Sequence, residues 1–231
     1  MTDSLRSAHP RRPGVAVQLW GDAALFTRPE QKGERVSYPC PTPTAAVGAL
    51  EAIYWHPGVI YRIDTIEVLR PIARWSVRRN ETTVVPSLAS ALTGRTVDTA
   101  AGRARAQRMS LCLRDVAYRV HAFIELGPKA TKSIAAYLDQ FHRRVRRGAC
   151  FSQPYLGIRE FVADFGPVAD QPAEPIDLNM GLMPHSAVYA TDGTVTRWNW
   201  FHAELRKGVL QVPRDPITLS SSAGSGLEAA G

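Results

Sequence analysis

Val59–Leu69, VIYRIDTIEVL, alternates apolar and polar residues with a period of two, which is typical of a half-buried β-strand. A helical pattern precedes this strand. Thr42 and Pro43 are residue types preferred at the N-cap and the first helical position, and the helix is expected to run to about Trp55. Still earlier, Gly14–Trp20 (GVAVQLW) alternates again. The chain up to Leu69 is therefore predicted to form a strand, a helix and a second strand.

Downstream of this unit the same patterns return in a related order. Met109–Leu126 is expected to form a long strand. Thr131 or Ser133 then begins a second helix, which Gly148 ends. Leu156–Phe165 is expected to form a further strand. The order strand, helix, strand, strand, helix, strand predicts an α+β protein with the ferredoxin-like, RRM-like βαββαβ fold, in which one face of the antiparallel sheet stays free of helices.

The segments outside this pattern complete the expected organisation. A ferredoxin-like RNA-binding domain is expected at 15–166, after a flexible N-terminus at 1–14. Short β-like pieces predict a small C-terminal antiparallel β appendage at 167–213, and low complexity predicts a disordered tail at 214–231. The β-like pieces are His185–Tyr189, Val195–Phe201 and Val209–Val212.

A second irregular region lies inside the domain. Pro71–Arg79 is expected to continue the second strand beyond a bend. Residues 81–107 are then polar and weakly patterned, and they are expected to form a long excursion that carries Arg95, Arg103 and Arg105. A loop of this length usually has a function or awaits a partner.

Charge and composition indicate the class of partner. The net charge is +7, and only four of the 28 basic residues are lysines. Arginine binds phosphate oxygens and stacks on bases, which favours a nucleic-acid partner, although a coding bias towards arginine explains the same composition. No apolar run approaches the about 20 residues that span a bilayer, and no apolar segment follows the N-terminal arginines. A soluble, cytoplasmic protein with no membrane partner is expected.

The cysteines argue against a metal or disulfide framework. Cys40, Cys112 and Cys150 lie far apart, and no two of them form a close ligand pair. Their odd number fits free thiols in a reducing compartment. No metal site and no cofactor is predicted.

Several short blocks, taken together, resemble one known family. The matching blocks are Gly21–Glu30 (GDAALFTRPE), Glu34–Pro43 (ERVSYPCPTP), Glu51–Pro57 (EAIYWHP), Leu113–Tyr118 (LRDVAY), Arg143–Phe151 (RRVRRGACF) and Pro154–Phe161 (PYLGIREF). They occur in the family's order over roughly Val15–Phe165. The chain resembles the CRISPR-associated Cas five family of type I-C, the pre-crRNA endoribonucleases.

The resemblance implies an activity and its partners. It implies binding of the repeat hairpin of precursor CRISPR RNA and metal-independent cleavage through the 2′-hydroxyl, which leaves a 2′,3′-cyclic phosphate. The protein would then retain the 5′ handle of the guide RNA within a surveillance complex of several subunits, where target DNA is a further partner. It also implies a functional tyrosine in the block EAIYWHP, which is Tyr54 here.

The other catalytic groups of the family depart from the pattern in this chain. The resemblance implies a lysine and a histidine early in the second helix, where Ala136 and Tyr137 stand instead. Lys132, one helical turn earlier, is expected to supply the cation, and Tyr137 is a candidate substitute for the histidine, although its place in the apolar stripe favours core packing. His56 is a second candidate acid or base.

Arginines supply the expected RNA contacts. The candidate residues are Arg28, Arg35, Arg78, Arg79, Arg108, Arg143, Arg144, Arg146 and Arg147. The last four crowd the end of the second helix, and the helix dipole explains two of them but hardly four. Trp20, Trp55 and Trp75 are expected to pack in the core or at its edge rather than to stack on bases.

Two functions from different classes stay open. One is an endoribonuclease that cuts its repeat RNA and remains bound, and the other is a catalytically weak or inactive subunit that caps the 5′ handle. A DNA-binding regulator is disfavoured, because the sequence has no helix-turn-helix signature, no Walker loop and no acidic metal cluster.

Overall fold

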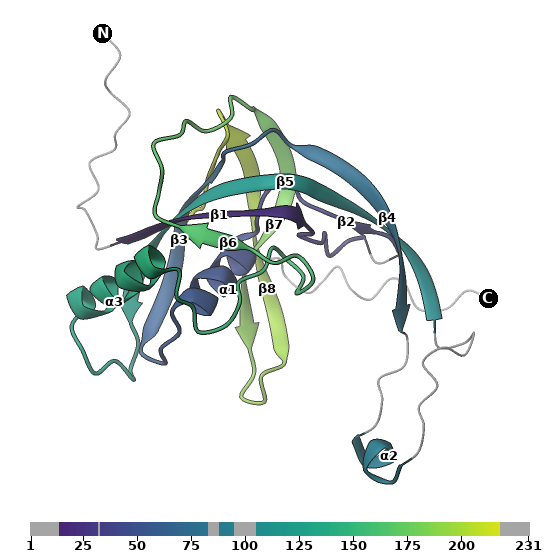
Figure 1. The fold of residues 1–231 in the computed structure, drawn as a ribbon, viewed down its shortest axis with the longest axis horizontal. Helices are drawn as coiled ribbons and strands as arrows, with labels where there is room; N and C mark the ends of the chain where they lie inside the picture. Colours follow the sequence, from purple (N-terminus) through teal and green to yellow (C-terminus); the bar gives the residue numbers. More distant parts are fainter. Residues whose placement is uncertain (1–13, 32, 83–87, 95–104, 218–231) are drawn as a thin grey trace.

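The computed structural model describes residues 14–31, 33–82, 88–94 and 105–217 (Figure 1). The expected flexible N-terminus up to residue 13, Arg95 and Arg103 of the excursion, and the tail from 218 lie outside the described residues. No described helix is long and apolar enough to cross a membrane.

Strands are the commonest element among the described residues, with three helices between them. In chain order the elements are β1 (Gly14–Ala24), β2 (Arg35–Val36), α1 (Pro43–Ile53), β3 (Val59–Val68), β4 (Ala73–Thr82), α2 (Leu88–Leu92), β5 (Arg105–Leu126), α3 (Ile134–Arg147), β6 (Asp164–Gly166), β7 (Leu178–Tyr189), β8 (Val195–Arg206) and β9 (Val209–Gln211).

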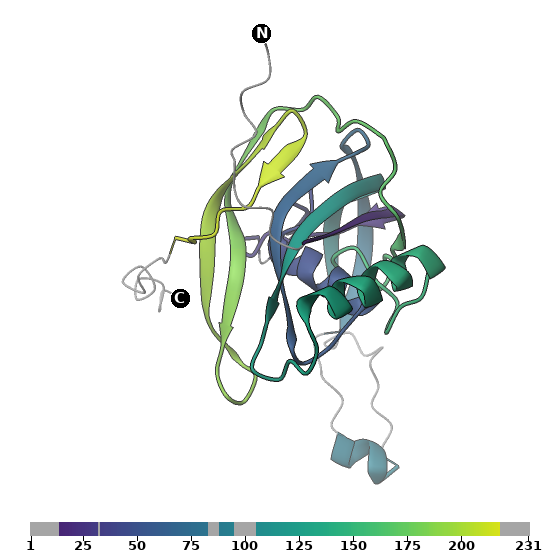
Figure 2. The ribbon, with the colours of Figure 1, turned by 90° about the vertical axis from the view of Figure 1, so that its left-hand side faces the viewer.

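All strands join one curved sheet, which is antiparallel except for the short β2–β5 pair. Its main path runs β6-β1-β5-β3-β9-β8-β7. The 22-residue strand β5 organises it, because β1 lies along one edge while β3 and β4 pair with successive parts of the other. Helices α1 and α3 lie side by side beneath this sheet (Figures 1 and 2).

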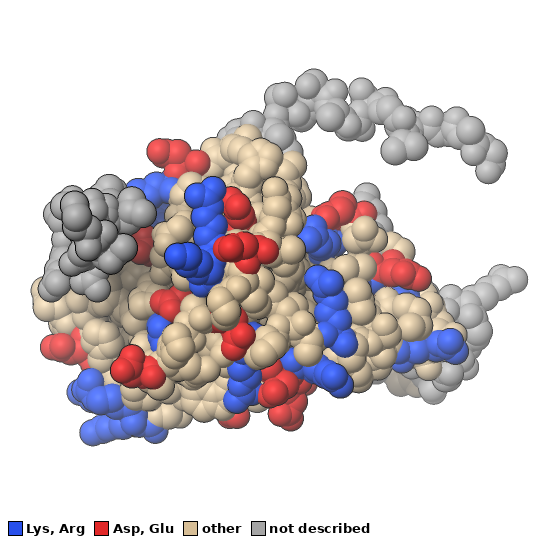
Figure 3. Space-filling model, turned by 90° about the horizontal axis from the view of Figure 1, so that it is seen from above, with Lys and Arg blue, Asp and Glu red and all other residues tan. Residues whose placement is uncertain are grey.

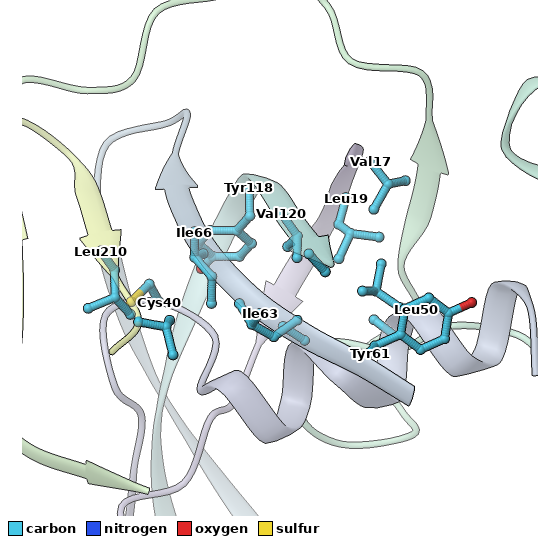
Figure 4. Close-up of a cluster of buried hydrophobic side chains, with 14 of the residues drawn as sticks. Val17, Leu19, Cys40, Leu50, Tyr61, Ile63, Ile66, Tyr118, Val120 and Leu210 are labelled. Atoms are coloured by element: carbon cyan, nitrogen blue, oxygen red, sulfur yellow. The ribbon is translucent and has the colours of Figure 1, made fainter. Parts of the chain in front are cut away.

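The core fills the space between the sheet and the helices. Val17 and Leu19 of β1 point towards Leu50 of α1 (Figure 4), and all three are buried. In β3 the buried positions change phase from Ile63 to Ile66, since the pairing with β5 shifts register between Ile63 and Thr65. This bulge keeps apolar side chains on the core face along a strand that bends.

Helices α1 and α3 begin at hydroxyl-bearing N-caps, and α3 ends at a glycine. The Thr42 hydroxyl accepts a hydrogen bond from the Ala45 N–H at 3.2 Å, as expected for an N-cap. Of the two alternatives for α3, Ser133 is the cap. Gly148 ends this helix in the left-handed conformation with φ of 62°, which confirms its expected role. Helix α1 ends at Ile53, two residues earlier than expected.

The expected strand Leu156–Phe165 is largely wrong, since only Asp164–Gly166 is a strand there. Gly157 has φ of +89°, a conformation that breaks an extended chain, and a Cβ on it would lie 2.0 Å from the Leu25 carbonyl oxygen. The segment therefore folds into a tight loop against β1. Leu156 is buried in that loop, which explains why the apolar pattern imitated a strand.

The regions at 71–107 and 167–213 contain more strand than expected. The second strand does not run on past Val68 without a break: β3 ends there and β4 begins at Ala73, both paired with β5. The excursion contains the end of β4, the start of β5 and the short helix α2. In the C-terminal region β9 pairs with β3, so β7, β8 and β9 extend the main sheet.

Charges are mixed on the side of the sheet that faces away from the helices. Seen from above, lysines and arginines lie among aspartates and glutamates, without a broad field of one sign (Figure 3). The basic excess of the chain is therefore not gathered on this face.

Candidate functional site

The end of α1 and the segment after it lie along one face of α3. The His56 ring lies 4.9 Å from the Tyr137 ring between centroids, and the Arg144 guanidinium lies 5.4 Å from the centre of the Tyr54 ring. Tyr137 and Arg144 are seven residues apart in α3, which is two helical turns, so both project from the same face. The structure thus brings together three of the expected catalytic residues, although they come from separate parts of the chain.

A close backbone contact holds this arrangement. Gly58, two residues after His56, lies against the loop that leads to α3. A Cβ on Gly58 would lie 2.3 Å from the Ala130 Cα, so only glycine fits. The Gly127 N–H donates to the Gly58 carbonyl oxygen at 3.0 Å across the same contact. The position of His56 relative to the start of α3 is therefore fixed by main chain.

Tyr54 is the C-cap residue of α1, and its side chain is 9% exposed. Its hydroxyl makes no hydrogen bond within the described residues, and it is not sealed from solvent. Burial raises the pKa of Tyr54, and a negative charge on Tyr137 would raise it further, while Arg144 acts in the opposite direction. A neutral phenol with a hydroxyl available to a ligand can donate or accept a proton there.

Tyr137 is fully buried, and its hydroxyl lies at the loop before α3. It accepts hydrogen bonds from the Thr131 N–H at 2.9 Å and from the Lys132 N–H at 3.2 Å. Burial acts to raise the pKa of Tyr137, but these hydrogen bonds and the nearby Lys132 charge lower it below its ordinary value. The Lys132 side chain itself is exposed, so its ammonium group is available to a phosphate.

His56 is partly buried, and one of its ring nitrogens accepts a hydrogen bond. The Gly58 N–H donates to His56 Nδ1 at 3.0 Å. A nitrogen that accepts a hydrogen bond from a backbone N–H carries no proton, so the neutral ring carries its proton on Nε2. His56 is therefore oriented to donate from Nε2.

The arginines at the end of α3 lie beside this cluster. Arg143, Arg144, Arg146 and Arg147 form no ion pair with the acidic residues of the described chain. Arg144 donates to the Ile53 carbonyl oxygen at 3.0 Å and so joins α3 to the end of α1. An open hollow of 280 Å³ is lined by Arg143, Arg144 and Arg147 with the residues that follow the helix.

The arginines of the β4–β5 ribbon lie far from this cluster, on the opposite side of the molecule (Figure 1). Arg35 and Glu81 form a two-point ion pair at 2.6 and 2.9 Å, and Arg108 lies 3.5 Å from the same carboxylate. Arg79 is paired with Glu160. The structure thus divides the expected RNA-binding residues into two groups.

The other two candidate arginines have different surroundings. Arg78 is exposed on β4. Arg28 lies 4.2 Å from the centre of the Tyr38 ring and donates to Glu30 at 3.1 Å and to the Met180 carbonyl oxygen at 3.3 Å. Its guanidinium therefore joins the loop between β1 and β2 to β7.

One pair of aromatic residues beside the cluster was missed from the sequence. The Trp55 and Phe151 rings are stacked, with centroids 5.9 Å apart and an angle of 28° between their planes. They are 50% and 65% exposed, so of the two expected places for Trp55 the core is wrong, and the residue lies at the edge of the domain. The sequence held one signal: Trp55 follows the last helical turn and precedes His56 and Pro57, outside the apolar stripe of α1.

Candidate metal ligands are not grouped in this region. Among the described residues, no three His, Cys, Asp or Glu side chains lie close enough to hold a metal ion. Of the cysteines, Cys40 and Cys112 are buried and Cys150 is partly buried, all as free thiols. Burial raises the pKa of Cys40 to about 12, so this thiol stays protonated.

Comparison with known proteins gives the family. Residues 14–220 match the Cas5d family model, described as a CRISPR-associated protein. The chain is 40% identical to the CRISPR pre-crRNA endoribonuclease Cas5d of Thermus thermophilus over 87% of this chain and 92% of the relative. It is 38% identical to the protein of the same name from Mannheimia succiniciproducens over 86% and 94%.

A solved structure shares the fold. The crystal structure of a CRISPR-associated protein superposes with a TM-score of 0.65 at 19% identity, and the match covers 88% of this chain and 93% of the other. The family model spans nearly all described residues, and the identity to both relatives extends over most of each chain. This chain therefore belongs to the Cas5d family of CRISPR-associated proteins.

Proposed function

We propose that this protein binds the repeat hairpin of precursor CRISPR RNA, cleaves it without a metal ion, and retains the 5′ handle of the guide. The observation that carries the proposal is the 40% identity to a pre-crRNA endoribonuclease over most of both chains. The cluster of Tyr54, His56, Tyr137 and Lys132 supports it. These side chains lie beside arginines without acidic partners, which suits a phosphate backbone.

Metal-free cleavage depends on three contributions from the protein. The 2′-hydroxyl attacks the adjacent phosphorus and loses its proton, the bond to the 5′ oxygen breaks, and that oxygen takes up a proton. Extra negative charge on the phosphate oxygens has to be stabilised meanwhile. The products are a 2′,3′-cyclic phosphate and a 5′-hydroxyl.

The cluster offers groups that can protonate the leaving oxygen and stabilise the charge on the phosphate. The Tyr54 hydroxyl has no partner among the described residues and is not sealed from solvent. His56 carries a proton on Nε2, which suits protonation of the leaving oxygen. The exposed Lys132 ammonium and Arg144 supply positive charge for the phosphate. Arg143, Arg146 and Arg147 bind the RNA backbone further along α3.

The wider setting belongs to the same proposal. Strands β6, β1, β5 and β3 with α1 and α3 form a ferredoxin-like core at 15–166, and the strand order β6-β1-β5-β3 supports this assignment. Residues 167–213 form its appendage. The protein works in the cytoplasm within a type I-C surveillance complex, beside other subunits, guide RNA and target DNA.

Incubation of a labelled repeat hairpin with wild type and Tyr54→Phe in EDTA tests the proposal. We expect wild type to yield a 2′,3′-cyclic phosphate, and the variant to bind with unchanged affinity but to cut at least ~100-fold more slowly. Tyr189→Phe, which changes an exposed tyrosine of β7, is the matched control and should cut like wild type. Cleavage that requires a divalent ion, or full activity of Tyr54→Phe, would contradict the mechanism.

A second function has a specific observation in its favour. Tyr137 stands where the family has a histidine, is fully buried, and accepts two backbone hydrogen bonds, which is the behaviour of a structural residue. A chain that lacks the Lys–His pair can keep its RNA affinity while losing its rate. Tight hairpin binding without any product would identify a subunit that caps the 5′ handle.

A further inference from the structure

The exposed aromatic pair Trp55–Phe151 lies at the junction of the two helices and plays no part in the cleavage steps above. We propose that this pair is a stacking platform for an unpaired base of the repeat RNA, next to the phosphate held at Tyr54. This inference rests on the proposed function, because it assigns part of the same substrate to a neighbouring surface.

The platform is held in place by backbone contacts. The Phe151 N–H donates to the Ala52 carbonyl oxygen at 2.8 Å and to the Ile53 carbonyl oxygen at 3.2 Å, and the Ser152 N–H donates to Ala52 as well at 3.0 Å. The chain after α3 is therefore fixed to the last turn of α1. Trp55 follows directly, so the two rings meet because the main chain brings them together. A stack that is already ordered costs little entropy when a base binds.

The surroundings of the pair select a nucleotide. Arg144 donates to the same Ile53 carbonyl oxygen and lies over the Tyr54 ring, so a guanidinium lies at the end of α1 where the platform is anchored and beside the candidate catalytic tyrosine. The hollow lined by Arg143 and Arg147 includes the residues just before Phe151. Aromatic faces beside arginines without acidic partners are the composition by which proteins bind single-stranded nucleic acid.

The same features identify which part of the RNA is bound. Trp55 and Tyr54 are adjacent in the chain, with Cα atoms about 3.8 Å apart. A base stacked on Trp55 therefore belongs to a nucleotide at or beside the one whose phosphate meets Tyr54. A paired base inside a duplex cannot offer its face to a protein ring, so the platform requires an unpaired nucleotide at the edge of the hairpin.

An abasic scan of the RNA tests the platform directly. Each unpaired position of the repeat is made abasic in turn, in RNA with a 2′-deoxyribose at any bond that wild type cuts, and binding is measured. We expect one or two positions to lower wild-type affinity by roughly 5- to 150-fold, the range for loss of a base–aromatic stack. In the double variant Trp55→Leu/Phe151→Leu the same abasic positions should change affinity by no more than about twofold.

Matched variants separate stacking from folding. Trp55→Phe/Phe151→Tyr keeps two aromatic faces and should keep the sensitivity to abasic positions. Tyr189→Leu/Trp198→Leu removes two exposed aromatics from the β7–β8 hairpin and should leave binding unchanged. The scan on wild type alone is decisive if the leucine variant does not fold.

The outcomes distinguish this inference from the proposed function. Wild-type binding that is indifferent to every abasic position, or a folded leucine variant with wild-type affinity and sensitivity, overturns the platform and leaves the RNA function intact. Failure of wild type to bind the hairpin at all overturns both.

Discussion

Replacing Gly58 by alanine is expected to disturb the candidate site through the backbone alone. The added Cβ would lie 2.3 Å from the Ala130 Cα, 2.4 Å from the Ala130 nitrogen and 2.7 Å from the Lys129 carbonyl carbon. Carbon atoms in contact lie about 3.5–4.0 Å apart, so the two segments have to separate by about 1 Å. All three neighbours are main-chain atoms, and no side chain can rotate away to absorb the overlap.

The size of the effect follows from this overlap. Overpacking of this kind costs about 1–3 kcal/mol of unfolding free energy. For a chain of this size that lowers Tm by roughly 2–12 °C. The same shift moves His56 away from Tyr137, and a displacement of about 1 Å in a catalytic group can lower the rate by about 100-fold. Urea unfolding and single-turnover cleavage of the repeat hairpin measure the two effects separately.

Gly127→Ala is the matched control. Gly127 donates its N–H to Gly58 across the same contact, but a Cβ on Gly127 would meet the Ile60 Cδ1 at 3.4 Å, an ordinary contact. Its stability should stay within about 0.5 kcal/mol of wild type. If Gly58→Ala and Gly127→Ala have the same urea midpoint of unfolding, close backbone approach does not fix His56.

Three further changes have expected outcomes. Gly48→Ala, at an exposed position inside α1 with no atom within 4 Å of the new Cβ, should raise the unfolding free energy by about 0.5–1 kcal/mol in urea melts. Burial raises the pKa of Glu51, so the stability that its protonated form contributes is lost as pH rises through that raised pKa. Glu51→Gln should therefore match wild type at acid pH and exceed it near pH 7. Arg143→Ala/Arg147→Ala should weaken RNA binding without changing the bond that is cut, and should reduce the slope of log affinity against log salt by about two.

Each of these three has a result that would contradict it. An unchanged or lower stability of Gly48→Ala would mean that α1 needs its glycine. A constant difference between Glu51→Gln and wild type across pH would mean that the carboxyl titrates normally. An unchanged salt slope in the double arginine variant would remove the end of α3 from the RNA surface.

Local signals in the sequence predicted the elements well wherever a cap or a simple alternation carried them. Thr42 begins α1 and Gly148 ends α3 as expected, because capping depends on residues close in sequence. The strand expected at Leu156–Phe165 failed because burial in a loop and burial in a strand select the same apolar residues. Pairing partners are not encoded locally, which is why the sequence did not indicate that β9 would pair with β3.

The candidate site was predictable only in part, because a motif is local in sequence whereas the contacts between distant segments are not. The family resemblance pointed to Tyr54, and the structure brings His56 and Tyr137 beside it through contacts between distant segments. The two separate groups of arginines could not be told apart from composition. Acidic partners such as Glu81 and Glu160 join the arginines of the β4–β5 ribbon only after folding.

The proton positions in the cluster bear on the choice between cutting and capping. The Gly58 N–H occupies His56 Nδ1, and the Tyr137 hydroxyl accepts two backbone N–H groups, so each of these side chains keeps a proton to donate. His56 therefore suits protonation of a leaving 5′ oxygen, whereas Tyr137 is fully buried and is better placed to support the loop before α3. Neither suits removal of the 2′-hydroxyl proton, which needs an unoccupied lone pair. If the departure at Ala136 and Tyr137 removes the base that the family uses, while His56 stays as a proton donor, we expect RNA binding to be retained and cleavage to be slow, at a rate set by whatever base reaches the 2′-hydroxyl.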